Sequence, residues 1–108
     1  MPIFRLLGGT RREVFTYATG GYYAEGEPRT ACADELGGFI AAGYRAVKLK
    51  TCGMSMADEI VRISATREAI GDAMLMLDMN APYSVNDCIE FTRSVVPFDI
   101  FWLEEPLH

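Results

Sequence analysis

The stretch AMLMLDMN, at residues 73–80, is apolar at nearly every position until it reaches Asp78. A continuous apolar run of this length is typical of a β-strand buried on both faces, and such strands occur mainly in parallel sheets covered by helices. The stretch therefore predicts a buried strand over residues 73–79, with a helix on either side of it along the chain.

Helix-start signals occur both before and after this strand. Ser55 begins an apolar stripe at helical spacing, Asp58 follows three positions later as in a capping box, and Gly71 ends the stripe. Ser84 and Asp87 repeat the start signal after the strand. The sequence therefore predicts one long helix before the buried strand and a second helix behind it.

Further segments complete an alternating pattern. Strands are predicted for RAVKLK at 45–50, DIFWL at 99–103 and VFTYAT at 14–19, and a helix is predicted over residues 31–42, ending at Gly43. The order βαβαβαβ indicates an α/β protein with parallel strands joined by right-handed helical crossovers. An open doubly wound sheet and part of a (β/α)8 barrel, with about four βα units, both fit this order.

Composition and charge limit the classes of partner. The 108 residues suffice for one small domain, and the net charge of −5 without a basic cluster argues against nucleic acid. No apolar run approaches the roughly 20 residues of a membrane-spanning helix, and the N-terminus does not resemble a secretory signal. We expect a cytoplasmic protein with no nucleic-acid or membrane partner, whose cysteines are reduced thiols: Cys32, Cys52 and Cys88.

Polar residues collect where the predicted strands end. Lys48 and Lys50 lie two apart on one strand, so both side chains point to the same face. Asp78 and Asn80 have the same relation on the next strand, and Glu104 ends the last one. In a barrel, the carboxyl ends of the strands form the mouth of the active site, where these side chains would converge.

The chemistry of these residues favours proton abstraction beside a metal ion. Two neighbouring ammonium groups repel each other, which lowers the pKa of one and makes it a base near neutral pH. Carboxylates with amide support suit Mg²⁺, which stabilises a developing enolate. Taken singly, the same residues have plainer readings: Lys48 or Lys50 as a solvated charge, Asp78 as a helix cap and Asn80 as a turn residue.

Three motifs in order carry a resemblance to a known family. KLK at 48–50, LDMN at 77–80 and WLEEP at 102–106 resemble the mandelate racemase/muconate lactonising branch of the enolase superfamily. The resemblance implies a partial (β/α)8 TIM barrel, with residues 1–13 as the end of the linkage to a capping domain and 14–108 as the first half of the barrel domain. The sequence also lacks GxGxxG, so a dinucleotide site has little support.

The resemblance also implies roles for single residues. Lys50 would be the catalytic base and Lys48 the neighbour that tunes it, while Asp78 and Glu104 would bind Mg²⁺. Asn80 would lie beside the metal and the substrate.

Two tyrosines follow the first predicted strand, where members of the family contact the substrate. Tyr22 and Tyr23 are therefore candidates for substrate binding, although packing would explain two aromatic residues there equally well.

The activity implied is Mg²⁺-dependent removal of the α-proton from a small carboxylate or hydroxy acid, in a racemase, an epimerase or an acid-sugar dehydratase. A muconate-type cycloisomerase is the alternative parent. The third metal ligand, the second acid/base and the capping domain of the family are not found, and His108 has a loop position. We therefore expect a fragment that is inactive alone.

Two further readings remain. A non-catalytic half-barrel would self-associate into a homo-oligomer, because parallel strands with open edges make a poor monomer. A Schiff-base lysine barrel has less support, since that chemistry gives no reason for Asp78 and Glu104 to be present.

Overall fold

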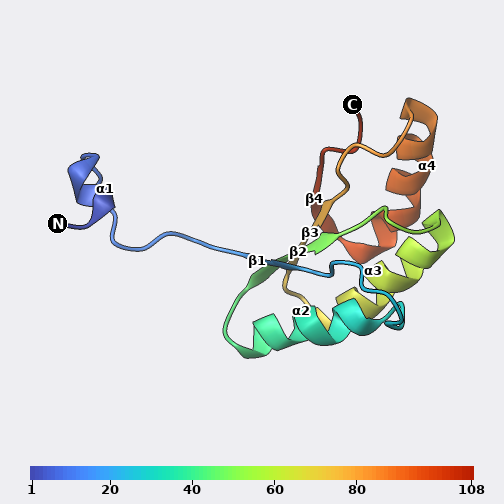
Figure 1. Ribbon diagram of the computed structural model, residues 1–108, viewed down its shortest axis with the longest axis horizontal. Helices are drawn as coiled ribbons and strands as arrows, with labels where there is room; N and C mark the ends of the chain where they lie inside the picture. Colours follow the sequence, from blue (N-terminus) through green and yellow to red (C-terminus); the bar gives the residue numbers. More distant parts are fainter.

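A computed structural model describes residues 1–108. Its core is one sheet of four parallel strands in the order β1-β2-β3-β4. The strands are β1 (Ala18–Gly20), β2 (Ala46–Lys50), β3 (Met74–Asp78) and β4 (Ile100–Glu104). Figure 1 shows the crossover helices α2 (Ala31–Ala41), α3 (Met56–Ile70) and α4 (Val85–Val95) along one side of this sheet. Because the strand order never reverses, the winding is that of a barrel and not of an open doubly wound sheet.

The three crossover helices begin at the residues that the sequence indicates. A one-turn helix, α1 (Ile3–Leu6), and a short 3₁₀ turn, η1 (Val96–Phe98), were not predicted. Ser55 caps α3 by accepting a hydrogen bond from the backbone N–H of Asp58 at 3.2 Å, and Ser84 accepts from Asp87 at 3.3 Å. Both predicted helix starts are therefore confirmed. None of the helices is long and apolar enough to cross a membrane.

The first strand is shorter than its sequence predicts. The apolar run at 14–19 predicts a strand throughout, but β1 begins only at Ala18, and the side chains of Val14 and Phe15 are exposed. Pairing with β2 starts at Ala18 and ends at Gly20, and no layer covers the residues before it. The β propensity of residues 14–17 thus has neither a ladder partner nor a core to support it.

The hydrophobic core lies between the sheet and the helices. Val47 and Leu49 of β2 are fully buried against this layer, together with Phe91 of α4 and Ile63 of α3. Since side chains alternate along a strand, burial of Val47 and Leu49 on the helix side turns the two lysines of β2 to the opposite face.

That opposite face is concave. Tyr17, which precedes β1, and Trp102 of β4 belong to the two edges of the sheet, yet their ring centroids are 5.7 Å apart at an interplanar angle of 81°. The sheet therefore curves enough for side chains from its first and last strands to meet across it, as inward-facing residues do in a barrel.

Candidate metal and proton-transfer site

The strand register brings the predicted site residues to one level. Lys50, Asp78 and Glu104 are direct neighbours across β2, β3 and β4, each at the carboxyl end of its strand. Lys48 lies one step below on the same face. Neighbours in parallel strands point to the same side, so these side chains converge on the concave face.

Asp78 lies between the two lysines. Its Oδ2 atom is 2.6 Å from Nζ of Lys50 and 3.3 Å from Nζ of Lys48. Lys48 also donates to both carboxylate oxygens of Glu104, at 3.1 and 2.9 Å. Lys50 donates to Oδ1 of Asn80 at 3.0 Å. The five residues thus form one connected cluster of alternating charge.

This alternation shifts the pKa values within the cluster. Burial lowers the pKa of Lys48, but its hydrogen bonds to Glu104 and Asp78 outweigh burial and raise that pKa above 10.5. Burial raises the pKa of Asp78, and the bonds from Lys50 and Lys48 outweigh it, so that this pKa falls below 3.8. At Lys48 the carboxylates that lie between the two positive charges therefore outweigh ammonium repulsion.

The donor set suits a hard cation in part. Oδ1 of Asp78 is buried without a hydrogen-bond partner, so this carboxylate oxygen is left available as a ligand. The carboxylate of Glu104 is 37% exposed at the mouth of the site. No group of three or more His, Cys, Asp or Glu side chains that could hold a metal ion is present. The cluster contains two carboxylates, the kind of group that Mg²⁺ prefers.

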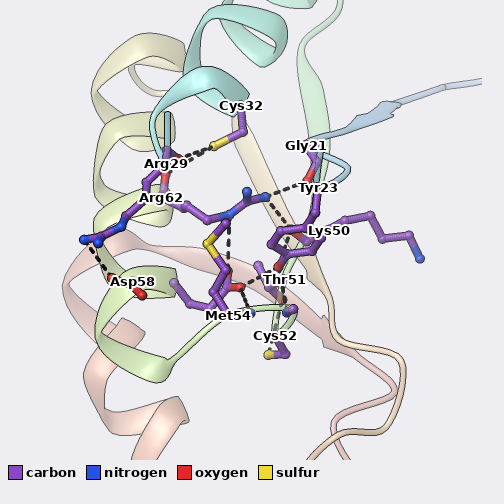
Figure 2. Close-up of polar contacts among 12 residues, drawn as sticks. Gly21, Tyr23, Arg29, Cys32, Lys50, Thr51, Cys52, Met54, Asp58 and Arg62 are labelled. Atoms are coloured by element: carbon purple, nitrogen blue, oxygen red, sulfur yellow. Dashed lines mark hydrogen bonds and ion pairs between the residues drawn. The ribbon is translucent and has the colours of Figure 1, made fainter. Parts of the chain in front are cut away.

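The two tyrosines after β1 point in different directions. The ring of Tyr22 lies 6.0 Å from Nζ of Lys50 and is exposed at the mouth of the site. The hydroxyl of Tyr23 donates to Glu59 at 2.5 Å and accepts from the backbone N–H of Gly53 at 2.9 Å. Figure 2 shows the side chain of Lys50 extending away from Tyr23. The structure thus brings the Tyr22 ring to the cluster, whereas the Tyr23 hydroxyl bonds to Glu59, to Gly53 and, at 3.5 Å, to the backbone carbonyl of Lys50.

Sequence reasoning missed two aromatic neighbours of the cluster. The ring of Tyr17 lies 5.5 Å from Nζ of Lys48, and Trp102 packs edge-on against Tyr17. Trp102 stands two positions before Glu104, so strand alternation could have placed it on the same face. No motif marks Tyr17.

The loops after β3 and β4 hold a strained backbone. Asn80, Ala81 and Glu105 have φ values of 53°, 55° and 47°, in the left-handed region. The N–H of Ala81 donates to the carbonyl of Glu105, and Asn80 Nδ2 donates to the carboxylate of Glu105 at 3.5 Å. Alanine rarely adopts this conformation, and such strain clusters at functional sites.

Comparison with known proteins agrees with this geometry. A barrel-type sheet with lysines and acids at its mouth places the chain in the class of α/β barrel domains. Residues 31–108 match the sequence family described as enolase C-terminal domain-like, and the chain belongs to the mandelate racemase/muconate lactonising branch of the enolase superfamily. The resemblance seen in the motifs is therefore confirmed.

The relatives are dehydratases, cycloisomerases, racemases and epimerases. Arabinonate dehydratase of Saccharolobus solfataricus is 36% identical over 98% of this chain and 29% of its own length. D-galactarolactone cycloisomerase of Agrobacterium fabrum is 39% identical over 97% of this chain and 28% of its own length. The crystal structure of a racemase from Streptomyces coelicolor A3(2) with bound magnesium superposes with a TM-score of 0.84, at 33% identity, over 99% of this chain and 30% of that one. The chain thus spans less than a third of these proteins, and the partial TIM barrel is confirmed.

Proposed function

We propose that this chain is part of a Mg²⁺-dependent enzyme that removes the α-proton of a small carboxylate or hydroxy acid, in a racemase, an epimerase or an acid-sugar dehydratase. The observation that carries the proposal is the cluster on the concave face, in which three ion pairs of 2.6–3.3 Å link the two ammonium groups to the two carboxylates. The sugar-acid dehydratases among the relatives support the substrate class.

Each side chain of the cluster has a role in this proposal. Lys50, in its neutral form, takes the α-proton onto Nζ, and Asn80 orients that atom through the hydrogen bond to Oδ1. Lys48 keeps a second positive charge next to the base. Asp78 and Glu104 would hold Mg²⁺, which would supply positive charge next to the developing enolate.

The tyrosines have separate parts in the proposal. Tyr22 covers the open side of Lys50 and contacts the substrate there. Tyr23 contributes to substrate binding through its backbone and its hold on the loop after β2, because its hydroxyl is already bonded.

The fate of the enolate distinguishes the possible parent enzymes. A dehydratase at 36% identity and a cycloisomerase at 39% are about equally similar to this chain. A cycloisomerase parent therefore stays the alternative, and both share the same first step. The proposal places the enzyme in the cytoplasm, in line with three free cysteines.

Exchange with solvent deuterium tests the proposal directly. The chain is incubated with Mg²⁺ in D₂O with a panel of 2-hydroxy acids and sugar acids, and loss of the α-proton signal is followed by NMR. The proposal predicts that any exchange depends on Mg²⁺, that Lys50→Ala abolishes it and that the exposed control Arg93→Ala leaves it unchanged. A folded chain without exchange on any acid would contradict an activity of these 108 residues.

A second candidate function is a non-catalytic half-barrel that self-associates. The outer edges of β1 and β4 have no strand partner in the sheet, and the side chain of Phe101 on β4 is 60% exposed. Such edges pair readily with other strands. We expect dimers or larger species in sedimentation velocity, which Phe101→Lys should weaken and the helix control Val61→Lys should not. A strictly monomeric chain would exclude this function.

A further inference from the structure

A second charged cluster lies beneath the carboxyl ends of the strands. Glu59 and Arg62 of α3 are 0% and 3% exposed, and Arg62 Nε lies 3.3 Å from Oε2 of Glu59. Removing a guanidinium and a carboxylate from water costs free energy unless further hydrogen bonds satisfy them. The hydrogen bonds that Arg62 and Glu59 make to other groups therefore decide whether this buried pair is tolerated.

Arg62 joins the ends of two strands. Its Nη2 donates to the carbonyl of Gly21 at 2.5 Å and to the carbonyl of Lys50 at 3.1 Å (Figure 2). Gly21 follows β1 directly, and Lys50 is the last residue of β2. One buried guanidinium thus fixes the peptide that carries the proposed base to the neighbouring strand.

Tyr23 and Glu59 hold this guanidinium in place. The ring of Tyr23 lies 4.1 Å from the guanidinium carbon of Arg62, and its hydroxyl donates to Oε1 of Glu59. The same Oε1 accepts from the backbone N–H of Met54 at 3.0 Å. The loop after β2 is therefore fixed on the same network as the end of β2.

Glycines make this close approach possible. A Cβ atom at Gly53 would lie 2.5 Å from the ring of Tyr23. Gly21 has φ +76°, and a Cβ there would lie 2.2 Å from Leu49. Both positions require the absence of a side chain, so the backbone around Arg62 is shaped for the contact.

We propose that Arg62, supported by Glu59 and Tyr23, is a positioning residue for Lys50. By holding the Lys50 carbonyl it sets the direction in which this side chain leaves the strand, toward Asp78 and Asn80. The inference rests on the proposed function only for the role of Lys50 as base.

The same helix provides a matched control. Arg67 also lies on α3 and bonds only to backbone carbonyls, those of Gly71, Ala73, Phe98 and Asp99, at 2.7–3.0 Å. These carbonyls belong to the opposite end of the sheet, where β3 and β4 begin. Loss of Arg67 should weaken the fold without affecting the site.

The experiment uses the fact that the chain contains only two lysines, Lys48 and Lys50. Labelling lysine with ¹³C at Cε gives two NMR resonances, assigned with Lys48→Met. The test variant is Glu59→Leu/Arg62→Leu, which removes both buried charges together and leaves neither unpaired. We expect the Lys50 resonance to move or broaden while that of Lys48 stays in place. Arg67→Leu should move neither.

Three results would overturn the inference: an unmoved Lys50 resonance, equal movement of both resonances, or the same change in Arg67→Leu. If the double variant does not fold, Tyr23→Phe carries the test with a smaller shift of Lys50 expected, and no shift there overturns the inference. The NMR measurement does not require the chain to be catalytically active. A wild-type chain without proton exchange would therefore count against an activity of these 108 residues and leave this inference standing.

Discussion

Asp78 is the residue on which both lysines of the cluster depend. One of its oxygens contacts both ammonium groups, and its side chain is only 5% exposed. Without its charge, Lys48 and Lys50 would remain on the same side of β2, with Glu104 as a carboxylate partner of Lys48 alone. Like charges repel more strongly where water is largely excluded.

Asp78→Asn should therefore destabilise the fold. We expect a loss of about 3 kcal/mol in the free energy of unfolding, the lower end of what removing one partner of a buried ion pair costs. Urea denaturation measures it. The control is Asp58→Asn in the surface pair with Arg29, whose side chain is 59% exposed, where we expect less than about 1 kcal/mol. Equal effects at the two positions would contradict the argument.

Tyr23 should give the stability a specific dependence on alkaline pH. Burial and the hydrogen bond to Glu59 raise the pKa of Tyr23 above 10.0 and outweigh the effects of Gly53 and Arg62. The folded state therefore keeps a proton that the unfolded state loses, so the contribution is full below pH 10 and is lost as the pH rises.

Measurement of unfolding free energy between about pH 9 and about pH 11 tests this. The wild-type value should fall with pH more steeply than that of Tyr23→Phe, by up to about 1.4 kcal/mol per pH unit. Parallel pH profiles would show that the Tyr23 hydroxyl is not protected in the folded chain.

Single residues also show which parts of the site can be predicted from the sequence. Strand alternation is sufficient to bring Lys50 and Asp78 together, because their positions follow from period and order alone. Tyr22 and Tyr23 could not be distinguished in this way, since adjacent residues at the start of a loop have no fixed direction. The partnership of Glu59 with Tyr23 spans a separation that no local pattern encodes.

At the scale of elements, the serine caps decide where helices begin. Ser55→Ala should lower the free energy of unfolding by about 1 kcal/mol, because the N–H of Asp58 loses its acceptor at the helix start. Ser64→Ala, at an exposed position inside the same helix, should change it by less than about 0.5 kcal/mol. Thermal or urea unfolding measures both, and a comparable loss at Ser64 would remove the capping argument.

The elements were predictable to different degrees for physical reasons. The second to fourth strands and the last two helices carry both a hydrophobic pattern and a start or stop signal, and the ends of α3 at Ser55 and Gly71 follow such signals. The first strand carries propensity alone. The length of β1 is set by its pairing with β2. That pairing is a tertiary contact, which the pattern of residues 14–19 does not encode.

At the scale of the whole molecule, the N-terminal segment lies apart from the sheet (Figure 1). No residue of 1–17 is buried. We propose that the barrel unit begins after residue 13 and expect deletion of 1–13 to change the free energy of unfolding by less than about 0.5 kcal/mol. Deletion of 1–20, which also removes β1, should destabilise strongly. A large effect of the shorter deletion would move the boundary.

The choice between a barrel and an open sheet also belongs to this scale. The alternation of strands and helices is the same in both, so the sequence pattern alone cannot separate them. The two folds are distinguished by the order of strands in the sheet, which depends on how the strands pair in the folded protein.

The contact between Tyr17 and Trp102 gives the molecule a built-in optical reporter. Trp102 is the only tryptophan, and its ring lies within 5.7 Å of Tyr17, the same ring that covers Lys48. Its fluorescence, and the excitation energy that it receives from tyrosine, therefore respond to the curvature of the concave face. Any cation, acid or further strand that enters this face and separates the two rings will change that emission without a label.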